Sequence, residues 1–261
     1  PDGTVWLCGE GGAAYQRPSR AWRPVPLEDL TAQCLLLTPS GQLWLGTSHG
    51  IWSVGSDGKN PRGPWVVPTP FMGGQVLELA VDAAGRLLIG TPEGLAYAEP
   101  GGGTGLLLGE RPTSLEIGPD GAIWVGTATG LYRATVGGEA LRVYEGAVAA
   151  LTVDPGGTPW LATAEGTLVR VAASGAEEVA GARDLATLGV RSLAVTSDGT
   201  LFVATSQGLG VLGPDGSYTM STVEEGLPDP DVRALALGPE DDLWVGTAHG
   251  LARRQSGGRW T

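Results

Sequence analysis

The stretch SGQLWLGTSHGIW, residues 40–52, decides the fold of this chain because it recurs along the whole length. Its further copies are DGTVWLCGEGGAAY (2–15), AGRLLIGTPEGLAY (84–97), DGAIWVGTATGLYR (120–133), GGTPWLATAEGTLV (156–169), DGTLFVATSQGLGV (198–211) and EDDLWVGTAHGLAR (240–253). The copies are anchored near residues 3, 41, 85, 121, 157, 199 and 241, with spacings from 36 (85 to 121) to 44 (41 to 85). Seven copies at this period are typical of four-stranded units repeated around an axis.

A run of alternating residues precedes each anchor after the first. Large aliphatic residues hold one phase, at Leu35/Leu37, Leu79/Val81, Leu115/Ile117, Leu151/Val153, Leu193/Val195 and Leu235/Leu237. The other phase is mostly small or polar. A period of two residues predicts a strand with two distinct faces. Small side chains suit the narrow part of a wedge near the axis, so we expect this to be the inner strand, A.

Three further strands follow in each copy. A turn with Asp-Gly or a similar pair leads into strand B, whose central residue is Trp6, Trp44, Leu88, Trp124, Trp160, Phe202 or Trp244. We expect these large residues to pack between blades. A glycine then turns the chain into strand C, at Gly12, Gly50, Gly94, Gly130, Gly166, Gly208 and Gly250. The outer strand D varies most and includes AWRPVP, PWVVP, LRVYE and GRWT.

The sequence therefore predicts one all-β domain over residues 1–261, a seven-bladed β-propeller with four-stranded antiparallel blades. The first blade lacks its inner strand, because no alternating run precedes the copy at 2–15. Either the chain is a piece of a longer protein, or that blade has three strands, or another chain donates one. An unpaired strand edge favours pairing with a partner.

Two apparent catalytic motifs fail in this context. GTSHG (46–50) matches the G-x-S-x-G nucleophile elbow, which requires a helix after the serine, but strand C follows Ser48. The last copy reads GTAHG, with Ala248 in place of the serine. GLGVLG (208–213) matches a dinucleotide-binding pattern, but no helix follows it to hold a pyrophosphate. We predict no catalytic residue from these motifs.

Composition narrows the classes of partner. The formal net charge is −12, the pI is near 4.5 and no basic stripe exists, which disfavours nucleic acid. No apolar run approaches the roughly 18 residues of a membrane span, and no signal peptide is recognised. Cys8 and Cys34 either form a disulfide or are small buried thiols, and no zinc-ligand spacing is present. No metal and no cofactor are predicted.

The segment EEGLPDPDVRALALGPEDDLWVGTAHGLARRQSGGRWT (224–261) resembles the two-component regulator propeller repeat. The matching features are a GLP turn, an inner strand, LW-x-GT, a hairpin, GL and an outer Trp, and variants of them recur along nearly the whole chain. The resemblance implies a bacterial propeller, commonly the extracytoplasmic sensor region of a histidine kinase. It favours a periplasmic or extracellular location. Such repeats also occur in free-standing proteins.

Positions that break the repeat are the candidates for function. The residue before the hairpin glycine changes from copy to copy and is polar in six of the seven. These candidate ligand-binding or partner-binding residues are His49, Glu93, Thr129, Glu165, Gln207 and His249, together with Trp52, an aromatic candidate for stacking on a sugar. Variable polar residues on a fixed scaffold are typical of binding faces. The two histidines are candidates for a shared pH-sensitive patch.

Glu78 and Glu116 lie in the small-residue phase of adjacent inner strands and are candidates for a central channel site. Two carboxylates near the axis suit a cation or a basic ligand group. The predicted function is non-catalytic binding of a protein, a small molecule or a glycan through the face of the B–C turns. The alternative is an enzyme similar to streptogramin B lyase or gluconolactonase-type propellers, with an axial metal site. No inner strand carries a histidine for that role.

Overall fold

The computed structural model describes residues 4–9, 12–17, 21–27, 31–38, 40–55, 58, 61–65, 74–179, 188–238 and 240–261. These residues form seven antiparallel sheets, each built from strands consecutive in the chain. The predicted all-β, seven-bladed β-propeller is confirmed. None of the helices in the described part of the chain is long and apolar enough to cross a bilayer.

The chain divides into two compact units, of which the first comprises residues 1–115 and 134–140. It holds the first three blades. Their strands are β1 (Val5–Gly9), β2 (Gly12–Gln16) and β3 (Arg23–Pro24); β4 (Ala32–Leu37), β5 (Leu43–Thr47), β6 (Gly50–Val54) and β7 (Arg62–Trp65); and β8 (Glu78–Val81), β9 (Leu87–Thr91), β10 (Gly94–Ala98) and β11 (Thr104–Leu108).

The second unit comprises residues 116–133 and 141–261 and holds the other four blades, although the first residues of β12 belong to the first unit. Its strands are β12 (Pro112–Ile117), β13 (Ile123–Thr127), β14 (Gly130–Ala134) and β15 (Leu141–Glu145); β16 (Val148–Val153), β17 (Pro159–Thr163), β18 (Leu168–Ala172) and β19 (Gly175–Glu178); β20 (Ser192–Val195), β21 (Leu201–Thr205), β22 (Gly208–Leu212) and β23 (Tyr218–Ser221); and β24 (Val232–Leu237), β25 (Leu243–Thr247) and β26 (Gly250–Arg254). The 3₁₀ helix η2 (Val223–Glu225) links β23 to β24.

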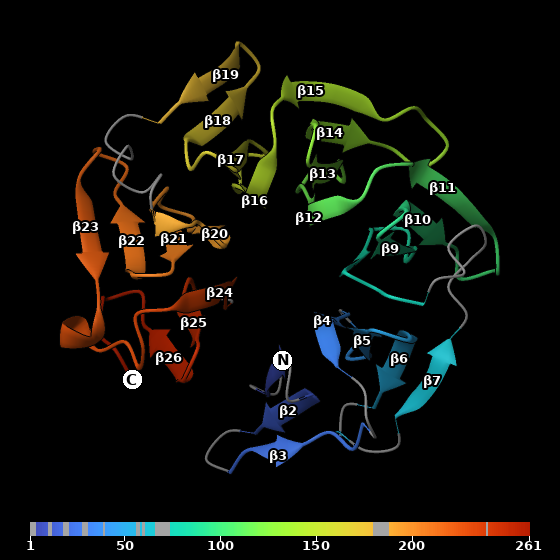
Figure 1. Cartoon of the computed structure of the whole chain (residues 1–261), viewed down its shortest axis with the longest axis horizontal. Helices are drawn as coiled ribbons and strands as arrows, with labels where there is room; N and C mark the ends of the chain where they lie inside the picture. Colours follow the sequence, from blue (N-terminus) through green and yellow to red (C-terminus); the bar gives the residue numbers. More distant parts are fainter. Residues whose placement is uncertain are drawn as a thin grey trace. The chain divides into compact units, whose positions relative to one another are not determined.

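Strand order within each blade follows the chain, as Figure 1 shows for β4 to β7 and for β20 to β23. The first blade has three described strands, in the order β1–β2–β3. Because β1 carries VWLCG, it is a B strand, and the predicted absence of an inner strand is confirmed in the described part of the chain. The seventh blade has three strands and an outer bridge between Arg254 and Trp260.

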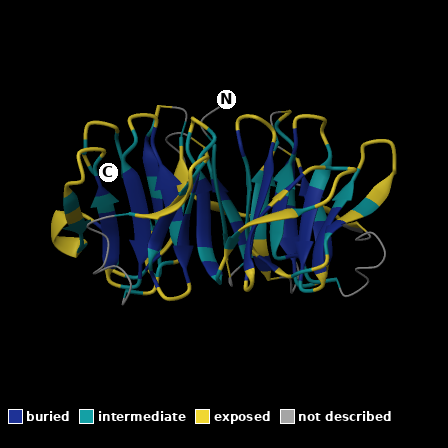
Figure 2. Cartoon of the chain, turned by 90° about the horizontal axis from the view of Figure 1, so that it is seen from above, coloured by how far each residue is buried: buried dark blue, intermediate teal, exposed yellow. Residues whose placement is uncertain are grey.

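Apolar side chains join neighbouring blades within each unit. In the first unit, Ile51 of β6 packs with Val76, Leu79 and Ile89 of the third blade. In the second unit, one cluster joins Ala150, Ala162 and Leu168 to Leu193, Leu201 and Val203 of the next blade. The B-strand aromatics contact these clusters, Trp44 in the first unit and Trp160 in the second, as predicted. Figure 2 shows the strands mainly buried and the connecting loops exposed.

The turn between the inner strand and strand B needs a positive φ at the repeat anchor. Gly41, Gly85 and Gly121 adopt φ values of 83°, 78° and 78°. In the seventh copy Asp241 takes this place with a φ of 58°, the only positive φ of a non-glycine residue among the described residues. Aspartate is one of the few residues that enter this region, because its short polar side chain bonds locally.

One hairpin differs from the prediction. Six of the predicted hairpin glycines begin strand C, but Gly166 does not, because β18 begins at Leu168. In this fifth copy the backbone N–H of Gly166 donates to the carbonyl of Thr163, and that of Thr163 donates to the carbonyl of Thr167. The longer loop is therefore closed by its own turn.

Candidate functional site

Four of the B–C hairpins share one threonine-based frame. The hydroxyl of Thr47 donates to the carbonyl of Gly50 at 2.8 Å and accepts from the backbone N–H of His49 at 3.1 Å. Thr91, Thr127 and Thr205 make the same two bonds in their own hairpins. These threonines are at most 1% exposed. Because the buried threonine hydroxyl has both a donor and an acceptor partner within the turn, the turn is held in one conformation. The residue before the glycine then lies on the solvent side.

The residues at that position are exposed in every copy that the structure describes. We call them the hairpin-turn positions: His49, Glu93, Thr129, Glu165, Gln207 and His249. Four of them, His49, Glu93, Thr129 and Gln207, lie on this threonine frame. Beside His249, the Thr247 hydroxyl donates to the Gly250 carbonyl, and Glu165 lies in the longer loop of the fifth hairpin. The structure thus places each of these six predicted residues on the surface, with its side chain available to solvent.

The two histidines have different partners and lie in different units. The ring Nδ1 of His49 lies 2.8 Å from the hydroxyl of Ser48. Strand β6 begins at Gly50, so the elbow geometry that would make Ser48 a nucleophile is absent here, as predicted. The ring Nδ1 of His249 lies 2.7 Å from a carboxylate oxygen of Asp229. The pKa of the Asp229 carboxyl is lowered, mainly by the hydrogen bond that it accepts from the backbone N–H of Asp231 and secondly by its hydrogen bond with His249.

Trp52 lies in the core and not at a hairpin turn. It pairs with Leu45 across β5 and β6 and packs against the cluster that includes Ala13, Tyr15 and Val54. A Cβ added at Gly63 would come within 2.8 Å of the Trp52 ring, so the backbone covers it closely. Trp52 is thus partly buried between the first two blades, and its stacking role stays a prediction.

Glu78 and Glu116 occupy different levels of their strands. Glu78 pairs with Gly90, as Cys34 of the second blade pairs with Gly46. Glu116 follows Leu115, the counterpart of Leu79, and therefore corresponds to Ala80. The two carboxylates therefore hold non-equivalent positions of their own strands, Glu78 in the first unit and Glu116 in the second. Burial raises the pKa of the Glu116 carboxyl to about 7.

Cys8 and Cys34 are both free thiols. Burial, with a smaller contribution from the Glu78 carboxylate, raises the pKa of Cys8 to about 11 and that of Cys34 further still. Both are therefore protonated near neutral pH, which fits the alternative of small buried thiols. Among the described residues, no group of three or more His, Cys, Asp or Glu side chains is arranged to hold a metal ion.

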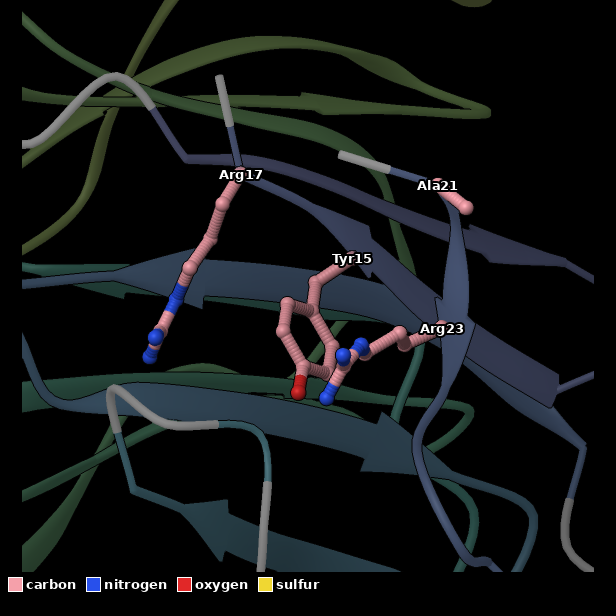
Figure 3. Close-up of a pocket in the computed structure, with 4 residues that line it drawn as sticks. All are labelled: Tyr15, Arg17, Ala21 and Arg23. Carbon is pink, nitrogen blue, oxygen red and sulfur yellow. The ribbon is translucent and has the colours of Figure 1, made fainter. Parts of the chain in front are cut away.

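One hollow was not predicted from the sequence. Tyr15 and Arg17, at the end of β2, line it together with Ala21 and Arg23, on the return to the outer strand (Figure 3). It lies at the C-terminal end of β2, opposite the end at which Gly12 pairs with Gly9 of β1. The available signal was Tyr15, which faces Trp6 at a position where other blades place an arginine.

No protein-family model and no curated protein matches this chain. Solved structures do match in fold. A structure named streptogramin B lyase has a TM-score of 0.78 at 15% identity and covers 97% of this chain and 89% of its own. YCF48, solved with a D1 peptide bound, has a TM-score of 0.76 at 13% identity and covers 98% of this chain and 89% of its own.

The third similar structure is the extracellular domain assigned to the hybrid two-component system BT3049 of B. thetaiotaomicron. It has a TM-score of 0.74 at 18% identity, over 94% of this chain and 36% of its own. At these identities the likeness shows the seven-bladed fold alone. That fold is shared by a lyase, a sensor-protein domain and a peptide-bound protein, so function has to be argued from the residues of this chain.

Proposed function

We propose that this chain is a non-catalytic binding module that holds a protein or small-molecule ligand at its hairpin-turn positions. The observation that carries the proposal is the contrast between a constant buried frame and a variable exposed residue. The threonine hydroxyls and the glycine carbonyls repeat, whereas the exposed side chains are imidazole, carboxylate, hydroxyl and amide. Such variation on a rigid scaffold is how loops acquire specificity.

Within this function, the repeat resemblance favours a ligand-sensing domain or an interaction scaffold of the two-component regulator propeller type. The BT3049 domain and the peptide-bound YCF48 support that choice at the level of fold. A periplasmic or extracellular location follows from the same resemblance. A glycan remains among the small-molecule ligands proposed, recognised by the polar hairpin-turn side chains.

The enzyme alternative rests on Glu78 and Glu116 acting at one axial site. No inner strand carries a histidine to serve as the catalytic base of such a site. We therefore assign neither Glu78 nor Glu116 to catalysis.

The test is affinity purification from native cell-envelope and cytosol lysates with matched variants. The turn variant carries Glu93→Gln and Glu165→Gln. The control carries Glu99→Gln and Glu139→Gln, two exposed residues on C–D connections with the same change of charge. We expect a stoichiometric ligand or protein that the wild type and the control retain and the turn variant loses. Equal retention by both variants would contradict binding at the hairpin-turn positions.

A second candidate function is acceptance of a β-strand along β1. In the described structure β1 pairs only with β2, and none of its five residues is buried. The corresponding strands β13 and β21 are buried at all five residues. An edge strand with open N–H and C=O groups is a template for pairing.

The repeat defines what such a strand must look like. In the second blade Cys34 faces Gly46, Leu35 faces Leu45, Leu36 faces Trp44 and Leu37 faces Leu43. A strand on β1 therefore needs a small residue opposite Cys8 and large aliphatic residues opposite Leu7 and Val5. The inner strand of the seventh copy, VRALAL (232–237), has this pattern.

A synthetic peptide with the sequence of residues 228–238 tests the edge directly. We expect it to slow hydrogen exchange of the β1 amides and to raise the melting temperature. The control peptide replaces the leucines at positions 235 and 237 by lysine and should do neither. Equal effects of both peptides, or no protection of β1, would reject strand acceptance while leaving the hairpin-turn proposal untouched.

A further inference from the structure

We propose that the hollow formed by Tyr15, Arg17, Ala21 and Arg23 binds an oxyanion, the phosphate or carboxylate group of a larger ligand. The site lies on the first blade, at the end of β2 away from the hairpin turn. It is therefore separate from the hairpin-turn positions, and its test does not depend on theirs.

The floor of the hollow is a fixed tyrosine. Tyr15 is only 5% exposed, and its ring stacks on Trp6 with the centroids 5.0 Å apart. A Cβ added at Gly58 would come within 2.1 Å of the Tyr15 ring, so the backbone of the second blade closes over it. A ring held in this way presents its hydroxyl at one place, which lowers the entropy lost on binding.

Two arginines flank the tyrosine. Figure 3 shows the side chain of Arg17 on one side of the Tyr15 ring and that of Arg23 on the other. Ala21, the fourth lining residue, adds no charge. Guanidinium groups present paired N–H donors that match the geometry of carboxylate and phosphate.

The first blade differs from three others in what covers its B-strand tryptophan. In those blades an arginine does so: Arg133, for example, lies over Trp124 at 5.7 Å and also pairs with Asp120 at 3.0 Å. In the first blade Tyr15 takes that place and stacks on Trp6. Within the described part of the chain, the Arg23 side chain makes no ion pair with a carboxylate.

Charge and size limit the ligand. The protein carries a net charge of −12, so an anion is repelled by the chain as a whole and needs a local concentration of positive charge. No carboxylate is present among the described residues that line the hollow. The cavity itself is about 30 Å³, far below the roughly 300–1,000 Å³ of drug-sized sites, so it suits a single anionic group of a larger ligand.

The experiment is isothermal titration calorimetry of the full chain with inorganic pyrophosphate and with citrate, at pH 7.5 and fixed ionic strength. We expect saturable binding of at least one of them. Saturation by pyrophosphate alone identifies a phosphate site, and saturation by citrate alone identifies a carboxylate site. Arg23→Gln and Arg17→Gln should each weaken binding at least about tenfold, because each removes a charge-assisted pair of hydrogen bonds.

Arg142→Gln is the matched control, since Arg142 is exposed on β15 and the net charge changes equally. It should bind like the wild type. Arg23→Lys keeps the charge but loses the planar guanidinium with its paired N–H donors. Its affinity for the anion should lie between those of the wild type and Arg23→Gln. Absence of saturable heat with both anions would overturn the proposal, as would equal affinities for Arg23→Gln and Arg142→Gln in proteins with the wild-type melting temperature.

Discussion

At the scale of single residues, the exposed hairpin-turn residue depends on the buried threonine beside it in four of the hairpins. Thr205 is fully buried, and its hydroxyl donates to the carbonyl of Gly208 at 2.7 Å. Thr205→Val keeps the shape but leaves that carbonyl and the N–H of Gln207 without their partner. We expect a loss of about 1–3 kcal/mol in the free energy of unfolding, measured by urea denaturation. Thr219→Val, at an exposed strand position, should change it by less than about 0.5 kcal/mol.

Glu116 gives stability a dependence on pH. Its pKa is about 7 in the folded protein because of burial, against 4.5 for the free group. The raised pKa means that the stability associated with the neutral carboxyl is fully present below pH 4.5 and is lost as pH rises through 7. Glu116→Gln is neutral throughout. Its stability relative to the wild type should rise by on the order of 2 kcal/mol between pH 4.5 and 8, measured by urea denaturation.

Glu139→Gln, which removes an exposed carboxyl, should show no such difference across that range. A flat difference for Glu116→Gln as well would mean that the Glu116 carboxyl stays solvated in the folded protein.

At the scale of strands, the inner strand determines what strand B can carry. At Gly90 an added Cβ would lie 2.8 Å from a Pro112 ring carbon and 2.9 Å from the Glu78 Cβ. At Gly246, the same position in the seventh blade, the nearest atoms are those of Ala234 at 3.7 Å. Gly90→Ala should cost about 1–3 kcal/mol through overpacking, whereas Gly246→Ala should be close to neutral. Thermal melts of the pair measure this, and equal losses would contradict the packing argument.

The same comparison explains which elements were predictable. The period-two runs and the repeated turns predicted the strands that the structure shows, including the first blade without an inner strand. Gly166 was misplaced, because the fifth hairpin has a longer loop than the glycine spacing suggests. Trp52 was predicted as a ligand contact because it breaks the repeat, and the structure shows that this partly buried ring also packs against the cluster that contains Ala13. The hollow at Tyr15 was missed because its arginines lie outside the repeated motif.

At the scale of the whole molecule, the fold is shared with proteins of different activities, so the function of this chain depends on where a ligand binds. The hairpin turns and the C–D connections lie at opposite ends of the same strands. In the sixth blade Gln207 lies at the first end and Asp215 at the second, both exposed. Because both residues lie on the same blade, probes placed at these two positions differ mainly in which end of the strands they sample.

The most direct measurement is photo-cross-linking from these two positions, with a photoreactive amino acid placed at Gln207 in one protein and at Asp215 in the other. Each protein is incubated with the native lysate, and its adducts are identified by mass spectrometry. Our account predicts a specific adduct from position 207 and none from position 215. An adduct from position 215 alone would place the binding surface at the other end of the strands and contradict the central claim.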